Sequence, residues 1–85
     1  MSYSVLLRPA VDRDLKSMPF QIRSRVEGAI DRLRENPRPS GTRKLVGFEN
    51  EWRLRVGDYR VLYVIDDSKQ QIVVARVAHR REAYR

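Results

Sequence analysis

The spacing of apolar residues predicts two helices in the first half of the chain. Val11, Leu15 and Met18 recur at intervals of three or four residues, which places them on one face of a helix that begins near Pro9. After Pro19 a second helical stripe consists of Ile22, Val26, Ala29, Ile30 and Leu33. A short apolar strand at 3–8 precedes this helical hairpin, and the proline- and glycine-containing segment 36–41 ends it.

In the second half the period changes from that of a helix to that of a strand. Residues 52–56 alternate between apolar and charged side chains, and much of 59–65 does the same, as strands with one buried face do. Gly57 and Asp58 between them indicate a two-residue hairpin turn, and a further strand follows at 72–78. We therefore expect an α+β fold: an N-terminal strand, a helical hairpin and an antiparallel meander of three or four strands, with both helices packed on one face of a curved sheet.

The turn also predicts which residues face each other across the hairpin. With Gly57 and Asp58 as the two turn residues, register pairs Leu54 with Val61 and Trp52 with Tyr63. Such apolar and aromatic pairs are suited to packing beneath the helices. Trp52 is therefore expected to be a core aromatic residue.

The opposite face of the same hairpin carries arginines. Arg55 is predicted to lie opposite Arg60, with Arg53 two residues further along the strand. Like charges directly opposite each other destabilise an antiparallel pair, so this arrangement favours an anion site over a merely solvated surface. Asp58, at the turn, is the acid that could neutralise Arg60. We refer to the surface formed by Arg53, Arg55 and Arg60 as the arginine face.

The register of the last strand follows from the loop at 67–70. Counting back through four loop residues brings Val77 opposite Arg60, which puts His79 on the arginine face and Arg80 beside it at the edge. Arg76 is then directed toward the core face, where it needs an acid partner or access to the rim. A change of one residue in the loop would move every side chain to the other face.

Composition narrows the class of protein. The chain of 85 residues has 18 Lys and Arg against 11 Asp and Glu, a net charge of +7, and is expected to form one domain over 1–85. Most of the cations are arginine, whose planar fork grips phosphate. With no cysteine and a single histidine, neither a metal nor another cofactor is expected. No segment reaches the roughly 20 apolar residues of a membrane helix, so we expect a cytoplasmic protein without membrane contact.

Three segments give a resemblance that covers almost the whole chain. They are Asn36-Pro37-Arg38-Pro39-Ser40-Gly41 with Lys44-Leu45, then Trp52-Arg53-Leu54-Arg55-Val56-Gly57-Asp58-Tyr59-Arg60-Val61-Leu62-Tyr63, and finally Val77-Ala78-His79-Arg80-Arg81-Glu82-Ala83-Tyr84. In this order the sequence resembles the RelE branch of the RelE/ParE toxin–antitoxin superfamily. The resemblance implies the toxin of a type II system, silenced by a cognate antitoxin protein. It also implies an endoribonuclease that cuts messenger RNA in the ribosomal A site without a metal, by attack of the ribose 2′-hydroxyl to give a 2′,3′-cyclic phosphate.

The resemblance also implies roles for individual residues. Arg60 matches an arginine that grips phosphate, Arg80 one proposed as general acid, and Tyr84 a tyrosine that stacks on a base. Arg53 and Arg55 stand where well-known members have lysines, and they are expected to be catalytic as well as to bind RNA. The further residues expected to contact RNA are Lys44 and Arg81.

The general base is the open point of this assignment. Arginine is effectively never deprotonated, so Arg53 is a poor base, whereas His79 can exchange protons near neutral pH. The alternative is that the ribosome supplies part of the catalytic machinery. Two other functions fit the same fold: a ParE-like inhibitor of DNA gyrase without nuclease activity, and a non-catalytic basic module that only binds an acidic antitoxin segment.

Overall fold

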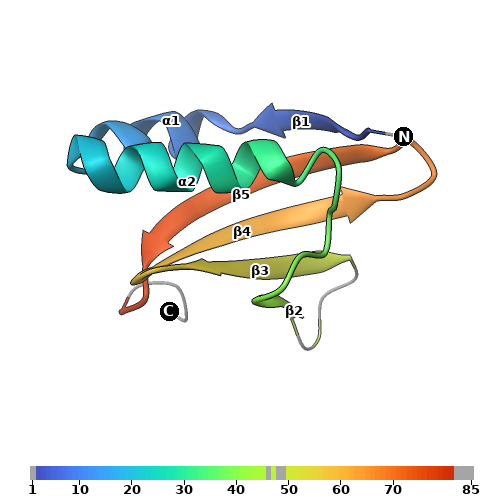
Figure 1. Cartoon of the computed structure of the whole chain (residues 1–85). Coiled ribbons are helices and arrows are strands. Elements are labelled where there is room, and N and C mark those ends of the chain that lie inside the picture. The colour runs from blue at the N-terminus through green and yellow to red at the C-terminus, as the bar shows by residue number, and fades with distance from the viewer. Residues whose placement is uncertain (1, 46, 48–49, 82–85) are drawn as a thin grey trace.

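A five-stranded sheet and two helices make up the fold in a computed structural model, which describes residues 2–45, 47 and 50–81 (Figure 1). In chain order the elements are β1 (Ser4–Leu7), α1 (Pro9–Lys16), α2 (Phe20–Arg32), β2 (Thr42–Lys44), β3 (Glu51–Val56), β4 (Tyr59–Asp66) and β5 (Gln71–His79). The strand order is β1-β5-β4-β3-β2. The expected α+β fold is confirmed. Two features add to it, because β1 pairs with β5 in parallel and β2 forms the opposite edge.

A proline stands at the start of each helix, inside α1 and directly before α2. Pro9 is the first residue of α1, and Pro19 directly precedes α2, where its fixed φ suits the entry into a helix. The buried residues of both helices fall on the predicted apolar stripes, so the helices cover the sheet with one face only. Within the described ranges, no helix is long and apolar enough to cross a membrane.

The β3–β4 hairpin has the predicted register. Trp52 pairs with Tyr63, Leu54 with Val61, and the turn residues are Gly57 and Asp58. Gly57 has a positive φ of 58°. A positive φ at the first of two turn positions is typical of a type II′ turn, whose twist matches that of the flanking strands.

The β4–β5 pairing follows the prediction only next to its loop. Tyr63 pairs with Val74 as expected, but a bulge between Leu62 and Tyr63 shifts the register by one residue. The prediction that Val77 lies opposite Arg60 is therefore wrong. Ala78 occupies that place, and Val77 faces Val61 within the core.

An acid from α1 holds the strand at this bulge. The Asp14 carboxylate accepts hydrogen bonds from the Arg76 guanidinium at 2.9 and 3.1 Å and from the Val77 backbone N–H at 2.9 Å. Arg76 pairs in register with Leu62, and its side chain is about half exposed. The prediction that Arg76 points toward the core face is wrong, whereas its need for an acid partner is confirmed.

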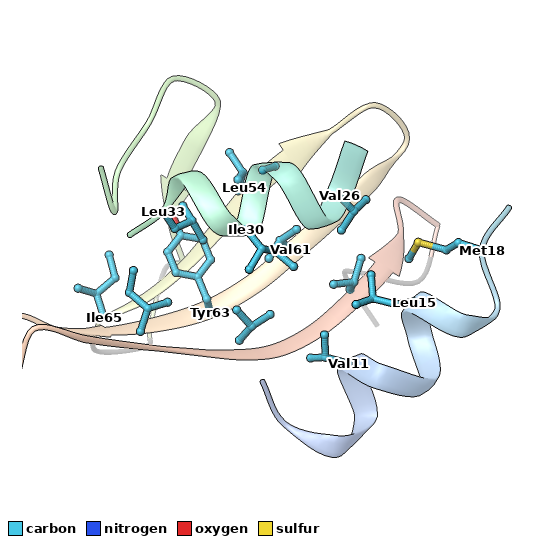
Figure 2. Packing of buried hydrophobic residues seen from close by; sticks show 14 residues of the cluster. Val11, Leu15, Met18, Val26, Ile30, Leu33, Leu54, Val61, Tyr63 and Ile65 are labelled. Carbon is cyan, nitrogen blue, oxygen red and sulfur yellow. The ribbon is translucent and has the colours of Figure 1, made fainter. Parts of the chain in front are cut away.

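The core lies between the helices and one face of the sheet (Figure 2). Val11 and Leu15 from α1 and Ile30 from α2 point toward the same cluster as Val61 and Tyr63 of β4. Tyr63 is only 1% exposed, and its hydroxyl donates a 2.7 Å hydrogen bond to the carbonyl of Pro37 in the segment that follows α2. Trp52 was predicted to be a core aromatic residue; it does pack against this cluster, but it is only partly buried.

A polar network closes the end of the molecule at the β4–β5 loop. Asp67 accepts hydrogen bonds from the Tyr3 hydroxyl at 2.7 Å and from the Arg38 guanidinium at 2.8 Å. The same guanidinium lies 4.9 Å from the centre of the Trp52 ring, a cation–π distance. Arg38 first, and Tyr3 after it, hold the pKa of Asp67 below its ordinary value. The network ties together four segments: the N-terminal residues, the segment after α2, β3 and the β4–β5 loop.

Candidate functional site

The arginine face forms as predicted on the side of the sheet away from the core. Arg55 lies directly opposite Arg60, and Arg53 follows two residues along β3, so all three share one face by strand alternation. The Leu54–Val61 pair between them points the other way, into the core. The helices thus shield one face of the hairpin and leave the cations on the other.

Arg60 is the centre of this group. It is only 9% exposed, and its Nη1 donates hydrogen bonds to the carbonyls of Tyr59 at 3.1 Å and Gly57 at 3.5 Å. Burial lowers the pKa of Arg60, and the neighbouring charges of Arg55, Arg53 and Arg80 lower it further. Asp58 raises this pKa only as the smallest of these effects. Burial and three neighbouring arginines thus outweigh the acid at the turn in their effect on this pKa, and two backbone carbonyls orient the Arg60 guanidinium.

Arg80 reaches this group through the end of β5. Its backbone N–H donates a 2.7 Å hydrogen bond to the Asp58 carbonyl, which fixes the chain beside the hairpin turn. The Arg80 guanidinium lies 4.0 Å from the Asp58 carboxylate and adds to the charge felt by Arg60. Arg81 follows as an exposed residue whose backbone N–H lies 3.4 Å from Nδ1 of His79.

Two predicted residues lie on the other face. The bulge pairs His79 with Tyr59, and the two rings meet edge to face with their centres 5.4 Å apart. His79 therefore lines a cavity of about 300 Å³ at the N-terminal part of α2, together with Arg25 and Ile22. The prediction that His79 shares the arginine face is wrong, because one extra residue in β5 turns its side chain over.

Lys44 is the second of these residues. It pairs in register with Trp52, on the helix-covered face, and is exposed at the sheet edge. Tyr84 lies outside the described residues. The structure therefore brings together Arg53, Arg55, Arg60 and Arg80 but does not add His79 or Lys44 to them.

Sequence reasoning missed Arg43. Within β2 it lies directly opposite Arg53, which extends the arginine face to the edge of the sheet. Because β2 spans only Thr42–Lys44, it offers no alternation long enough to be recognised as a strand. The sequence does show two adjacent cations, Arg43 and Lys44, shortly after Gly41. Which of them lies on the arginine face, however, depends on the β2–β3 register.

The chemistry open to this arrangement is the binding of an anion. Arg60 is pre-oriented by backbone carbonyls, and Arg53, Arg55 and Arg80 surround it, so a phosphodiester and the charge that develops during its cleavage would be stabilised here. Arginine remains protonated and is therefore unsuited to the role of general base. The face is thus suited to charge stabilisation rather than to proton abstraction.

Comparison with known proteins shows the family to which the chain belongs. The sequence model described as the ParE toxin of the type II toxin–antitoxin system parDE matches residues 5–84. The chain belongs to the RelE/ParE toxin family. Toxin RelG of Mycobacterium tuberculosis is 37% identical over 100% of this chain and 99% of its own length. Toxin RelE of the same organism is 33% identical over 98% of this chain and 87% of its own length.

Solved structures of RelE toxins share the fold. The archaeal RelE–RelB complex from Pyrococcus horikoshii superposes with a TM-score of 0.85 at 30% identity, over 98% of this chain and 100% of that one. The RelBE2 toxin–antitoxin complex from M. tuberculosis gives a TM-score of 0.81 at 30% identity, over 93% and 99%. The fold and the family membership of this RelE/ParE toxin therefore agree.

Proposed function

We propose that this RelE/ParE family toxin is a metal-independent endoribonuclease that cuts messenger RNA in the ribosomal A site. The observation that supports it is the buried Arg60, held by backbone carbonyls and surrounded by Arg53, Arg55 and Arg80. Burying a cation among like charges costs stability, and a bound phosphate would offset that cost. The arginines alone support the binding of an anion. Relatives named as RelE and RelG toxins are the reason for proposing RNA cleavage in addition.

The reaction is an internal transesterification. The ribose 2′-oxygen attacks the adjacent phosphorus, the O2′–P bond forms, and the P–O5′ bond breaks. A base takes the 2′-hydroxyl proton, and an acid supplies a proton to the leaving 5′-oxygen. The products are a 2′,3′-cyclic phosphate and a free 5′-hydroxyl, and the step needs no oxidant, reductant or other co-reactant.

In this proposal each arginine has a role that follows from its position. Arg60 holds the scissile phosphate, while Arg53 and Arg55 stabilise the charge that grows on its oxygens. Arg80, fixed beside the turn, faces the leaving oxygen. Arg81 and Lys44 contact the RNA chain outside the reacting group, and Tyr84 stacks on a base.

The base is assigned to a group outside the arginine face. His79 could act only from the neighbouring face, where it lies against Tyr59. This placement favours the alternative in which the ribosome supplies or aligns the base. A cognate antitoxin protein silences the toxin, a proposal supported by the solved RelB–RelE complexes of its relatives.

A second candidate is inhibition of DNA gyrase without cleavage of nucleic acid. The family model carries the description of a ParE toxin, which favours this candidate. A gyrase inhibitor of this kind would share the fold, but its function would require no catalytic role for the arginines around Arg60.

Induced expression followed by primer extension on cellular messenger RNA tests the proposal. Wild-type protein should produce new ends within translated regions, and Arg60→Ala should reduce their yield by about 10²- to 10³-fold, the usual loss for one transition-state contact. Arg13→Ala, which removes an exposed arginine from α1, should cut like wild type. Circular dichroism must show both variants folded. Growth arrest with intact messages would refute the nuclease and favour gyrase.

A further inference from the structure

The arginine face extends one strand further than the cluster around Arg60. Arg43 of β2 lies opposite Arg53, parallel to the Arg55–Arg60 pair. Its side chain is exposed, and within residues 2–45, 47 and 50–81 it makes neither a hydrogen bond nor an ion pair. Two like-charged pairs therefore stand side by side, and each is unfavourable in isolation.

Protection of an edge strand is the simpler explanation for one charge here. β2 is an edge strand, and cations on edges discourage pairing with other chains. Lys44, the next residue, already provides an exposed cation on the other face of the same strand. Edge protection accounts for neither the position of Arg43 opposite Arg53 nor its alignment with the arginine face.

The spacing of the two pairs matches an extended nucleic-acid chain. The centres of the Arg43–Arg53 and Arg55–Arg60 pairs are two residues apart along β3, about 6.6–6.8 Å, and one strand apart across the sheet, about 4.7–4.9 Å, so they lie about 8 Å apart. This is comparable to the distance between neighbouring phosphates of an extended single strand. On the same face the next position along β3 is Glu51, a carboxylate that repels phosphate. Along β3 the positive surface therefore consists of two arginine pairs, Arg43–Arg53 and Arg55–Arg60, and ends at Glu51.

We propose that Arg43 binds the RNA phosphate next to the one held by Arg60, so that the open sheet face holds two successive phosphates. The inference rests on the proposed nuclease function and adds a binding position to it. Arg43 takes no part in bond breaking. It fixes the direction of the strand across β3 and thereby places the 2′-hydroxyl for attack.

The test uses a single-stranded RNA oligonucleotide with a 2′-deoxyribose at the attack position, which blocks cleavage, and follows binding by fluorescence anisotropy over a range of salt concentrations. Arg43→Ala should raise the Kd about two- to fivefold and reduce the slope of log K against log salt by about 0.7, the value for one phosphate of a single strand. Arg43→Lys should keep the slope. Arg13→Ala should behave as wild type.

Position is tested with one neutral methylphosphonate placed at each linkage in turn. At the linkage next to the cleavage site, the Arg43→Ala effect should disappear, because the charge it contacts is already absent. At distant linkages the two losses should add. Additivity at every linkage would overturn the proposal.

Other outcomes are also decisive. An equal loss of slope in Arg13→Ala and Arg43→Ala would show diffuse attraction to the net positive charge and overturn the proposal, as would a wild-type protein that binds no RNA. A variant that binds RNA normally but loses affinity for the antitoxin would assign Arg43 to the protein partner. If the slope depends on Arg43 but wild type cuts no RNA, the phosphate position stands and the nuclease function fails.

Discussion

Replacement of Asp14 by alanine tests the physical link between the helices and the arginine face. The carboxylate is 15% exposed and accepts hydrogen bonds from Arg76 and from the Val77 backbone N–H at the β5 bulge. Leaving the Val77 N–H without an acceptor costs about 1–3 kcal/mol, and the half-exposed ion pair with Arg76 contributes about 0–1 kcal/mol. We expect Asp14→Ala to lower the free energy of unfolding by about 2–3 kcal/mol.

Asp12 provides a matched control in the same helix. Its carboxylate is 65% exposed and pairs with Lys16, four residues later, so Asp12→Ala should cost about 0.3–0.5 kcal/mol. Both variants make the same change of residue in α1, so intrinsic helix propensity largely cancels between them. Asp14→Asn keeps one acceptor oxygen for the Val77 N–H and should fall between the two.

Urea-induced unfolding followed by far-UV circular dichroism measures these differences. If Asp14→Ala and Asp12→Ala agree within about 0.5 kcal/mol, the carboxylate does not hold the bulge and the reasoning fails. A destabilised but folded Asp14→Ala should also bind RNA more weakly, because the bulge sets the position from which Arg80 reaches Arg60. Unchanged RNA binding in a destabilised variant would separate the stability of the bulge from the geometry of the arginine face.

Two further predictions concern the ends of the sheet. The pKa of Asp67 is lowered in the folded state, so its contribution to stability is present above its ordinary value of 3.8 and is lost as the pH falls through the lowered value. The difference in Tm between wild type and Asp67→Asn should accordingly be full at neutral pH and vanish in strong acid; a constant difference would contradict the ion-pair explanation. Gly57→Ala should cost about 1 kcal/mol or more, because Gly57 has a φ of 58°. A neutral result in urea unfolding would show that the turn adapts.

The β3–β4 hairpin was predictable because its constraint is local. A two-residue turn fixes the pairing of the strands that it joins, so the positions of Arg53, Arg55 and Arg60 on one face followed from Gly57 and Asp58. The two helices were predictable for a similar reason, since their apolar stripes and flanking prolines lie within short stretches of sequence.

The bulge in β5 was not predictable, because the side chain that contacts the strand there lies far away in the sequence. Asp14 holds Arg76 and the Val77 backbone from a distance of more than 60 residues, and no local pattern marks the extra residue. The shift turned His79 away from the arginine face and brought Ala78 opposite Arg60. The prediction of a histidine within the cluster failed for this reason alone.

The sequence by itself determined the family, the apolar faces and the central arginines, since each depends on short-range periodicity or on a contiguous motif. Tertiary structure decided the burial of Arg60, the alignment of Arg43 with Arg53, and the face on which His79 lies. These three depend on pairing between strands and on contacts from α1. Strand alternation has a period of two, so one residue of register shift, set by a distant side chain, changes which groups can meet a ligand.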